Sequence, residues 1–414
     1  MNHISYIDAV KLITDKKNVA WNWDLSHITK ALRLCGSPEN QLKYIHVTGT
    51  NGKGSTCAMI RNILCDAGYK VGMFCSPSLF EYRDDITVDG NSISERDFAK
   101  IVEYLHEIGV LSTLTEFESL FVTAVYYFAQ IKCDIVVLEC GLGGKNDATN
   151  VIPTPEIAVF TPISIDHTSI LGSTVEEITV EKCGIIKDGC QIVVAPTQNE
   201  TSLEIIMQNA AQHGCFVHYP SIHSTKIISN NLDGICFEYD DNVIKIPMLG
   251  EHQRDNAVTA IQAVNSLHDF KCDRSNIING LAKTQIPLRQ QVVSRNPLVI
   301  VDGAHNFESF KSLANTLKNN NIMDITLIIG MLEDKEIEKC LYIIAEFVQK
   351  VIFCKPDNKR ALSSEKLREL WRKIGTCENM VIEDEAEKAI SIAERSQNVV
   401  ICGSFYLSKK YKRK

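Results

Sequence analysis

The stretch Tyr44-Ile-His-Val-Thr-Gly-Thr-Asn-Gly-Lys-Gly-Ser-Thr56 decides how the rest of the chain is interpreted. It begins as an apolar strand, continues as a glycine-rich loop and then enters a helical pattern. Glycines let backbone N–H groups converge on phosphate oxygens, and a helix N-terminus adds partial positive charge. In such a loop Lys53 would reach the β- and γ-phosphates, and the hydroxyl of Ser55 or Thr56 would lie near Mg²⁺. The sequence therefore predicts a nucleotide-binding loop.

The spacing of this loop differs from the common pattern G-x4-G-K-[ST]. Only two residues separate Gly49 from Gly52, and Gly54 stands between Lys53 and Ser55. A simple turn between strand and helix is the alternative, but the strand, the lysine and the hydroxyls together favour phosphate binding. The residues predicted to bind the nucleotide here are Gly49, Thr50, Asn51, Gly52, Lys53, Gly54, Ser55 and Thr56.

The composition excludes several classes of protein. The chain has 414 residues with 43 basic and 51 acidic side chains, which gives a formal charge of −8. An acidic balance argues against non-specific nucleic-acid binding, and no apolar stretch approaches the ~20 residues that span a bilayer. The N-terminus also lacks the apolar segment of a signal peptide. The 15 cysteines form no C-x2-C pair, so we expect a reduced cytoplasmic protein without disulfides or structural zinc.

Short runs rich in valine and isoleucine alternate with helical patterns, and Thr115-x-x-Glu118 and Thr174-x-x-Glu177 have the spacing of helix capping boxes. Strands that are apolar on both faces and joined by helices predict a parallel sheet covered on both sides. The expected fold class is α/β: a mostly parallel N-terminal sheet carrying the phosphate loop, and a smaller Rossmann-like C-terminal domain. The predicted strands are Lys43–Thr48, Lys70–Phe74, Asp134–Glu139, Glu156–Phe160, Gln191–Ala195, Leu298–Asp302, Ile325–Gly330, Val351–Cys354 and Asn398–Cys402.

The alternation breaks once, at residues 226–246, where three short runs separated by turn residues predict a small antiparallel insertion. We expect the domain boundary near Ser294–Pro297, after which a strand restarts the α/β series. This division predicts a nucleotide-binding domain of residues 1–295 and a C-terminal domain of residues 296–414.

The phosphate loop resembles that of the Mur ligase superfamily, and its Gly-Lys-Gly-Ser form resembles folylpolyglutamate synthase/dihydrofolate synthase. Further motifs, in the same order along nearly the whole chain, are similar to those of that family. They are Val137-Leu-Glu-Cys-Gly-Leu-Gly-Gly144, Asp147-Ala-Thr-Asn150, Ser164-Ile-Asp-His167, Glu181-Lys-Cys-Gly-Ile-Ile-Lys187, Leu249-Gly-Glu-His-Gln-Arg-Asp-Asn256, Val301-Asp-Gly-Ala-His-Asn306, Gly330-Met-Leu-Glu-Asp-Lys335, Arg360-Ala361 and Cys402-Gly-Ser-Phe-Tyr-Leu407.

The resemblance implies an ATP-dependent amide ligase of the EC 6.3.2 type. A carboxylate attacks the γ-phosphate of ATP to give an acyl phosphate, and an amino acid's amine then displaces phosphate. Both transition states concentrate negative charge, which metal ions and cationic groups stabilise. The resemblance implies ATP and two Mg²⁺ ions, with a small-molecule acid and L-glutamate as substrates. It also implies a monomer that binds neither nucleic acid nor a membrane.

The resemblance also assigns roles to single residues. The predicted metal-site residues are Ser76, Glu139, His167 and Lys182, of which Lys182 would be carbamylated. A carboxylate suits Mg²⁺, which takes few protein ligands besides phosphate and water. The ordinary alternatives are a turn serine, a hydrogen-bonding histidine and an exposed helix lysine. The predicted catalytic residues are Lys53, Lys182 and His305.

Other positions resemble substrate contacts. The residues predicted to contact the nucleotide outside the loop are Asn256, Arg289 and Asp302. The residues predicted near the acid and the amino acid are Thr115, Phe117, Asp147 and Ser404. Helix capping is the favoured explanation of the segment that begins at Thr115, and it explains Ser404 as well as substrate binding does. The resemblance implies that ATP binds between two domains whose closure assembles the site.

Four segments depart from the family pattern. Ser76-Pro-Ser-Leu79 and Asp84-Asp-Ile86 replace Ser-Pro-His-Leu and Glu-Arg-Ile, Lys145-Asn146 replaces Arg-Leu, and Ile286-Pro-Leu-Arg289 replaces Trp-Pro-Gly-Arg. The leading hypothesis is a ligase that adds L-glutamate to dihydropteroate, to a folate or to both. One alternative is the same chemistry on another acid or amino acid. A P-loop NTPase switch or an inactive binding paralogue is the other, but such a protein would not need the metal and acyl-phosphate groups.

Overall fold

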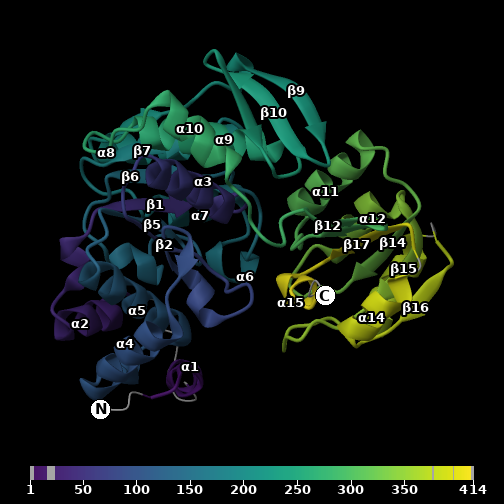
Figure 1. Ribbon diagram of the computed structural model, residues 1–414, viewed down its shortest axis with the longest axis horizontal. Coiled ribbons are helices and arrows are strands. Elements are labelled where there is room, and N and C mark those ends of the chain that lie inside the picture. The colour runs from purple at the N-terminus through teal and green to yellow at the C-terminus, as the bar shows by residue number, and fades with distance from the viewer. Residues whose placement is uncertain (1–3, 16–23, 375–376, 395, 412–414) are drawn as a thin grey trace. The chain divides into compact units, whose positions relative to one another are not determined.

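The computed structural model describes residues 4–15, 24–374, 377–394 and 396–411. The chain forms two compact units, Met1–His223 with Asp255–Lys283, and Ser224–Arg254 with Thr284–Lys414. Each unit has its own mostly parallel sheet (Figure 1). None of the helices in these ranges has both the length and the apolar character needed to span a bilayer.

The first unit is built on an eight-stranded sheet in the order β4-β3-β2-β5-β1-β6-β7-β8. Neighbouring strands from β2 to β8 pair in parallel, whereas β3 and β4 form an antiparallel edge. The strands are β1 (Tyr44–Thr48), β2 (Val71–Phe74), β3 (Ile86–Val88), β4 (Asn91–Ser92), β5 (Ile135–Glu139), β6 (Ile157–Phe160), β7 (Gln191–Val194) and β8 (Phe216–His218).

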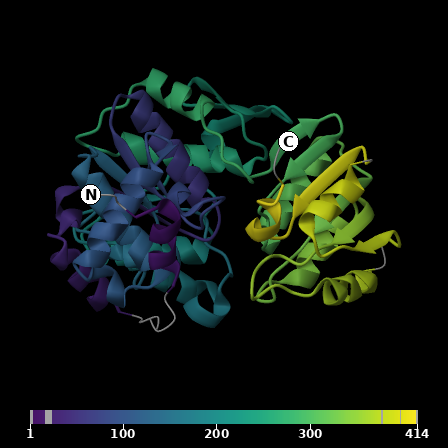
Figure 2. The same ribbon diagram turned by 60° about the horizontal axis from the view of Figure 1, so that its bottom comes forward.

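Helices lie on both faces of this sheet (Figure 2), and all five residues of β1 and of β5 are therefore buried. The helices are α1 (Tyr6–Thr14), α2 (Ser26–Leu34), α3 (Lys53–Asp66), α4 (Glu95–Glu107), α5 (Glu116–Gln130), α6 (Thr168–Leu171), α7 (Val175–Cys183), α8 (Glu200–Gln212), α9 (His252–Asn265) and α10 (Arg274–Ala282). Short 3₁₀ helices are η1 (Pro38–Gln41), η2 (Tyr82–Asp85), η3 (Val110–Thr113), η4 (Ala148–Val151) and η5 (Ile222–Ser224).

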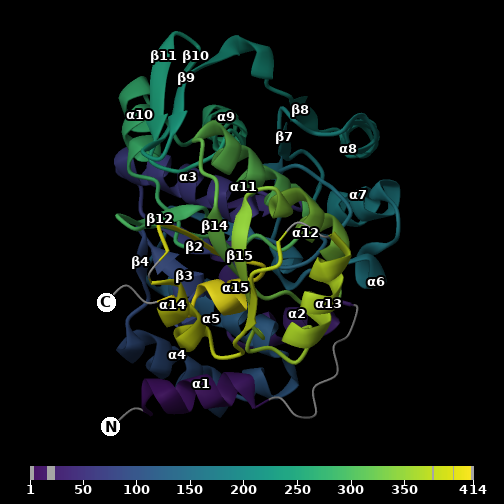
Figure 3. The same ribbon diagram turned by 90° about the vertical axis from the view of Figure 1, so that its right-hand side faces the viewer.

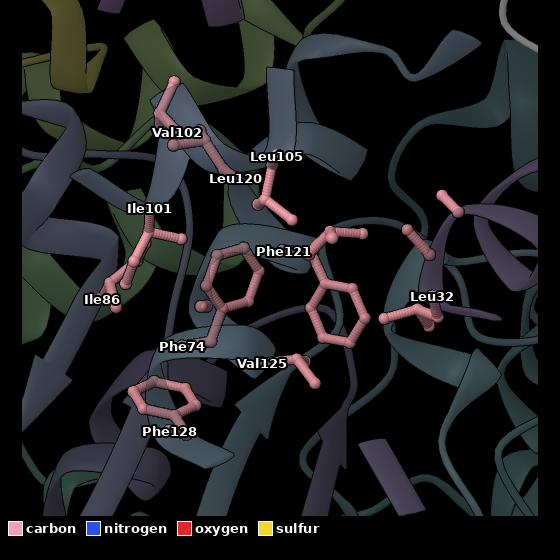
Figure 4. Packing of buried hydrophobic residues seen from close by; sticks show 14 of the residues in the cluster. Leu32, Phe74, Ile86, Ile101, Val102, Leu105, Leu120, Phe121, Val125 and Phe128 are labelled. Carbon is pink, nitrogen blue, oxygen red and sulfur yellow. The ribbon is translucent and has the colours of Figure 1, made fainter. Parts of the chain in front are cut away.

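One hydrophobic core of the first unit lies between α4, α5 and the strands β2 and β3. Figure 4 shows Phe74 and Phe121 near its middle and Phe128 below Phe74, with aliphatic side chains around them. The rings of Phe74 and Phe121 meet edge to face with centroids 5.5 Å apart. Phe74 ends β2, so this packing holds the strand end from which the next loop leaves.

The second unit contains two sheets. The smaller is antiparallel, in the order β11-β10-β9, and Figure 3 shows its strands side by side. The larger has the order β12-β13-β17-β14-β15-β16, in which only β12 is antiparallel to its neighbour. The strands are β9 (Thr225–Asn231), β10 (Gly234–Tyr239), β11 (Asn242–Ile246), β12 (Gln291–Arg295), β13 (Leu298–Val301), β14 (Ile325–Ile329), β15 (Val348–Phe353), β16 (Met380–Ile382) and β17 (Asn398–Cys402).

Helices α11, α12 and α13 share one hydrophobic core with the larger sheet, and α14 and α15 lie on its other face (Figure 1). This is the doubly wound arrangement expected of a Rossmann-like unit. The helices are α11 (Phe307–Asn319), α12 (Ile337–Ala345), α13 (Ser364–Ile374), α14 (Ala386–Ala393) and α15 (Phe405–Ser408).

The α/β fold class, every predicted strand and the antiparallel insertion are confirmed. Both predicted capping boxes are present, at the starts of α5 and α7. Just before the expected boundary, residues 291–295 form β12, a strand that is not among those predicted from the sequence and that forms a hairpin with β13. By contact the antiparallel insertion groups with the second unit. The division into domains at residue 295 stays a prediction.

Phe121→Ala should lower the free energy of unfolding by about 3–5 kcal/mol, because it opens a cavity in a packed core. Phe121 is fully buried, whereas Phe216 is 64% exposed, so Phe216→Ala is the matched control. The control should cost less than about 1 kcal/mol. Urea unfolding of both variants measures the difference, and equal effects would contradict the assigned core.

Candidate active site

The loop between β1 and α3 makes its turn with glycines. Gly49 has φ +144° and Gly52 has φ +87°. A Cβ at Gly49 would overlap the Thr161 hydroxyl, and a Cβ at Gly52 would overlap the Asn256 side chain. Both positions therefore require glycine for their conformation and for the close approach of a neighbour. This places Asn256, a predicted nucleotide contact, against the loop.

The first backbone N–H groups of the loop are already engaged. Pro162 O accepts from Thr50 N at 2.9 Å and from Asn51 N at 3.4 Å. The Thr50 hydroxyl lies 3.0 Å from both Ser164 N and Ser164 O. The N–H groups of the first turn of an α-helix have no partner within the helix. An anion would therefore meet the start of α3, from Lys53 onward, rather than the N–H groups of Thr50 and Asn51.

Two lysines meet at the carbonyl oxygen of Gly49. Lys53 Nζ donates to Gly49 O and to Thr50 O, both at 3.2 Å. Lys182 Nζ, from α7, donates to Gly49 O at 2.8 Å and is only 4% exposed. Burial, and then the charge of Lys53, lower the pKa of Lys182 to about 7. Lys182 is thus not the exposed helix lysine of the ordinary alternative.

Glu139 provides a carboxylate beside the phosphate loop. It ends β5, is 5% exposed, and its Oε2 lies 3.3 Å from the place that a Cβ of Gly54 would occupy. The buried Thr56 hydroxyl has no hydrogen-bond partner within the described residues, and Ser55 is buried beside it. Hard oxygen groups of this kind fit Mg²⁺. No group of three or more His, Cys, Asp or Glu in the described part of the chain could hold a metal alone, so phosphate and water would complete the shell.

The other two predicted metal residues lie on neighbouring segments. Ser76 follows Cys75, whose thiol pKa is raised by Cys57, by burial and by the nearby Glu139 carboxylate. His167 precedes α6 with φ +51°, and its N–H donates to Asp166 Oδ1 at 2.8 Å. Their roles as ligands stay predictions.

The predicted acid-substrate residues have structural contacts of their own. Asp147 is 6% exposed and accepts from Leu142 N at 2.7 Å and from Thr149 N at 3.0 Å. The Thr115 hydroxyl caps α5, as the capping box predicts. The Phe117 ring packs on Gly141, where a Cβ would lie 2.7 Å from it. Phe117 therefore covers the turn that begins two residues after Glu139.

Two departures from the family pattern lie close together. The Ser78 side chain lies near the carboxyl of Asp85, which is 4% exposed. Burial, with the nearby charges of Glu139, Asp84 and Glu116, raises the pKa of Asp85 well above its usual range. Sequence reasoning noted both substitutions without revealing that they are paired.

In the second unit two of the predicted site residues, Arg289 and His305, lie near the ring of Phe405. The Arg289 guanidinium lies 4.6 Å above the Phe405 ring, and the His305 ring is 5.9 Å from it. Asp302 is 5% exposed, and its carboxyl lies near the backbone of Gln290, Gly303 and Ala304. Burial raises the pKa of Asp302 to about 6, although the Arg289 charge opposes the rise.

Sequence reasoning missed Phe405. Its signal is Gly303, because a Cβ there would overlap the Phe405 ring. Ser404, just before it, accepts from Leu407 N at 3.2 Å and caps α15. Its predicted contact with the amino acid stays a prediction.

Comparison with known proteins gives the family. The Mur ligase middle domain matches residues 47–264, and the Mur ligase glutamate ligase domain matches residues 288–405. The chain is 34% identical over 376 residues to a dihydrofolate synthase/folylpolyglutamate synthase of Bacillus subtilis, with 86% of each chain covered. This chain belongs to the folylpolyglutamate synthase/dihydrofolate synthase family of Mur ligases.

Solved structures of this family agree with the fold. Folylpolyglutamate synthase of Mycobacterium tuberculosis complexed with ADP superposes with a TM-score of 0.88 at 26% identity, covering 98% of both chains. E. coli FolC in complex with DHPP and ADP gives 0.86 at 28% identity, covering 98% of this chain and 96% of that one. The Mur ligase described here is an ATP-dependent amide ligase.

Lys53→Ala in this Mur ligase should lower kcat/KM for ATP by about 100-fold or more, because it removes a cation from the phosphate loop. Lys100→Ala, on the exposed face of α4, is the control and should leave turnover unchanged. Steady-state ADP release measures both variants. Near-normal turnover by Lys53→Ala would refute the phosphate site.

Proposed function

We propose that this protein joins the α-amino group of L-glutamate to the carboxylate of dihydropteroate, of a folate, or of both, at the expense of ATP. The observation that carries the proposal is the match of residues 288–405 to the glutamate ligase domain. Relatives named dihydrofolate synthase/folylpolyglutamate synthase at 34% and 31% identity support the acid substrate. The protein is proposed to act as a monomer.

The reaction needs charge stabilisation more than a nucleophilic side chain. The acid's carboxylate attacks the γ-phosphorus and ADP leaves, and glutamate's amine then attacks the acyl phosphate and inorganic phosphate leaves. Lys53 and the first turn of α3 would stabilise the charge on the transferring phosphoryl group. Arg289 and Asp302 would bind the nucleotide, and His305 would contact the phosphoryl or acyl phosphate group.

Magnesium is proposed at Glu139, with the hydroxyl of Ser55 or Thr56, His167 and Ser76 as further candidates. When bound there, Mg²⁺ would supply Lewis-acid stabilisation of phosphate charge. The buried Glu139 carboxylate against Gly54 and the unpartnered Thr56 hydroxyl support this assignment.

A different acid substrate is the second candidate function. The Ser78–Asp85 pair favours it, because two family positions near the acid substrate are changed together and bring in a buried carboxyl. An inactive binding paralogue is disfavoured, since Glu139 and Lys182 lie buried at the phosphate loop.

ADP release with Mg-ATP and L-glutamate should rise at least about tenfold when dihydropteroate or tetrahydrofolate is added, because turnover needs both the acid and the amine. A coupled assay measures ADP, and mass spectrometry checks the glutamylated product. Omission of glutamate is the control. Failure of both acids would reject the folate proposal, and a panel of other carboxylates would then test the second candidate.

Lys182 is proposed to carry a carbamate. Its neutral amine adds CO₂ and releases a proton, and with a pKa of about 7 the amine is increasingly neutral above pH 7. Incorporation of ¹³C-bicarbonate should therefore rise from pH 6 to pH 8 and appear as a carbamate signal in ¹³C NMR. Lys182→Arg stays charged and should lose the signal. A wild-type spectrum without the signal at pH 8 would contradict the proposal.

A further inference from the structure

Arg289 lies in a backbone turn that is unfavourable for its neighbours. Leu288 has φ +60° and Gln290 has φ +45°, so both residues that flank Arg289 adopt the left-handed conformation. For an L-residue other than glycine this conformation costs about 1–2 kcal/mol. Such a turn persists only where surrounding contacts hold it.

The Gln290 side chain supplies those contacts. Gln290 is 4% exposed, and its Nε2 donates to Ser312 Oγ at 3.0 Å. Thr316 Oγ1 donates to Gln290 Oε1 at 2.6 Å. Ser312 and Thr316 lie one helical turn apart on α11, so both ends of the amide are fixed to one rigid element.

His252 extends this network. Its Nδ1 lies 2.7 Å from Ser312 Oγ, and its Nε2 lies 2.9 Å from Gln253 Nε2. Burial and the Arg289 charge lower the pKa of His252 to about 4. The ring is therefore neutral at pH 7, accepts from the Gln253 amide and donates to Ser312.

The backbone of the turn reaches the nucleotide residues. Gly303, the residue after Asp302, donates its N–H to Leu288 O at 2.8 Å, and the Asp302 carboxylate lies near Arg289 and near the backbone of Gln290. The turn is thus hydrogen-bonded to the residues that follow β13, and it places the Arg289 guanidinium over the Phe405 ring.

We propose that Gln290 is a positioning residue for nucleotide binding: its amide, held by Ser312 and Thr316, with Ser312 held in turn by His252, fixes the turn that orients Arg289. The inference rests on the proposed nucleotide role of Arg289. Gln290 touches neither ATP nor the reacting atoms in this role.

A double-mutant cycle tests the proposal in the full-length protein. Gln290→Ala should weaken the binding of AMPPCP, measured by calorimetry, by about tenfold, in the range of coupled neighbours. In the Arg289→Ala background the same change should weaken binding by less than about twofold, because the residue it positions is already gone. Multiplicative effects would overturn the proposal.

Two further variants separate the side chain from the strained backbone. Gln290→Gly relieves the left-handed conformation but lacks the amide, and it should bind AMPPCP as weakly as Gln290→Ala. Thr316→Val removes one donor with little change in volume and should weaken binding by a few-fold. Wild-type affinity in Gln290→Gly, or a lower melting temperature with unchanged affinity in Gln290→Ala, would overturn the proposal.

Gln349→Ala, on the exposed side of β15, is the matched control and should bind like the wild type. AMPPCP binding needs no acid substrate, so this test stands apart from the folate assay. If folate stimulates turnover but Gln290→Ala binds AMPPCP like the wild type, only the positioning role is rejected. If the cycle shows the expected coupling between Gln290 and Arg289 but folate does not stimulate turnover, only the folate proposal is rejected.

Discussion

One backbone oxygen, that of Gly49, organises the phosphate loop by accepting from Lys53 and Lys182 together. The shared acceptor ties α3 and α7 to the end of β1. It also brings two ammonium groups close together, and the burial of Lys182, followed by the charge of Lys53, makes Lys182 easy to deprotonate. Because a Cβ at Gly49 would overlap Thr161, no other residue could present its oxygen in this way.

The remaining candidate residues follow from the same architecture. Glu139 ends β5, Ser76 follows β2, Asp302 follows β13, and Ser404 follows β17. In open parallel sheets the carboxyl ends of the strands share one edge, where ligands bind. Because the strands are buried on both faces, the positions of their carboxyl ends are well defined. The short loops that follow then set only the orientation of the side chains.

The central strands could be predicted from the sequence, because runs of valine and isoleucine between helical patterns strongly indicate buried strands. The short strands β3, β4, β8, β12 and β16 carry little signal of their own and depend on pairing with distant segments. The phosphate loop could be predicted from its preceding strand, its glycines, its lysine and its hydroxyls, although its spacing is unusual. Phe405, the Ser78–Asp85 pair and the Gln290 network could not be found, because each depends on contacts between residues far apart or on a backbone conformation that only the fold imposes.

The Asp85 carboxyl places a constraint on its neighbour Ser78. A buried carboxyl that loses a polar neighbour is left at a cost of about 1–3 kcal/mol. Replacing Ser78 by an apolar residue is therefore expected to cost more stability alone than when the Asp85 carboxyl is removed as well. The stability effects of substitutions at the two positions are expected to be non-additive.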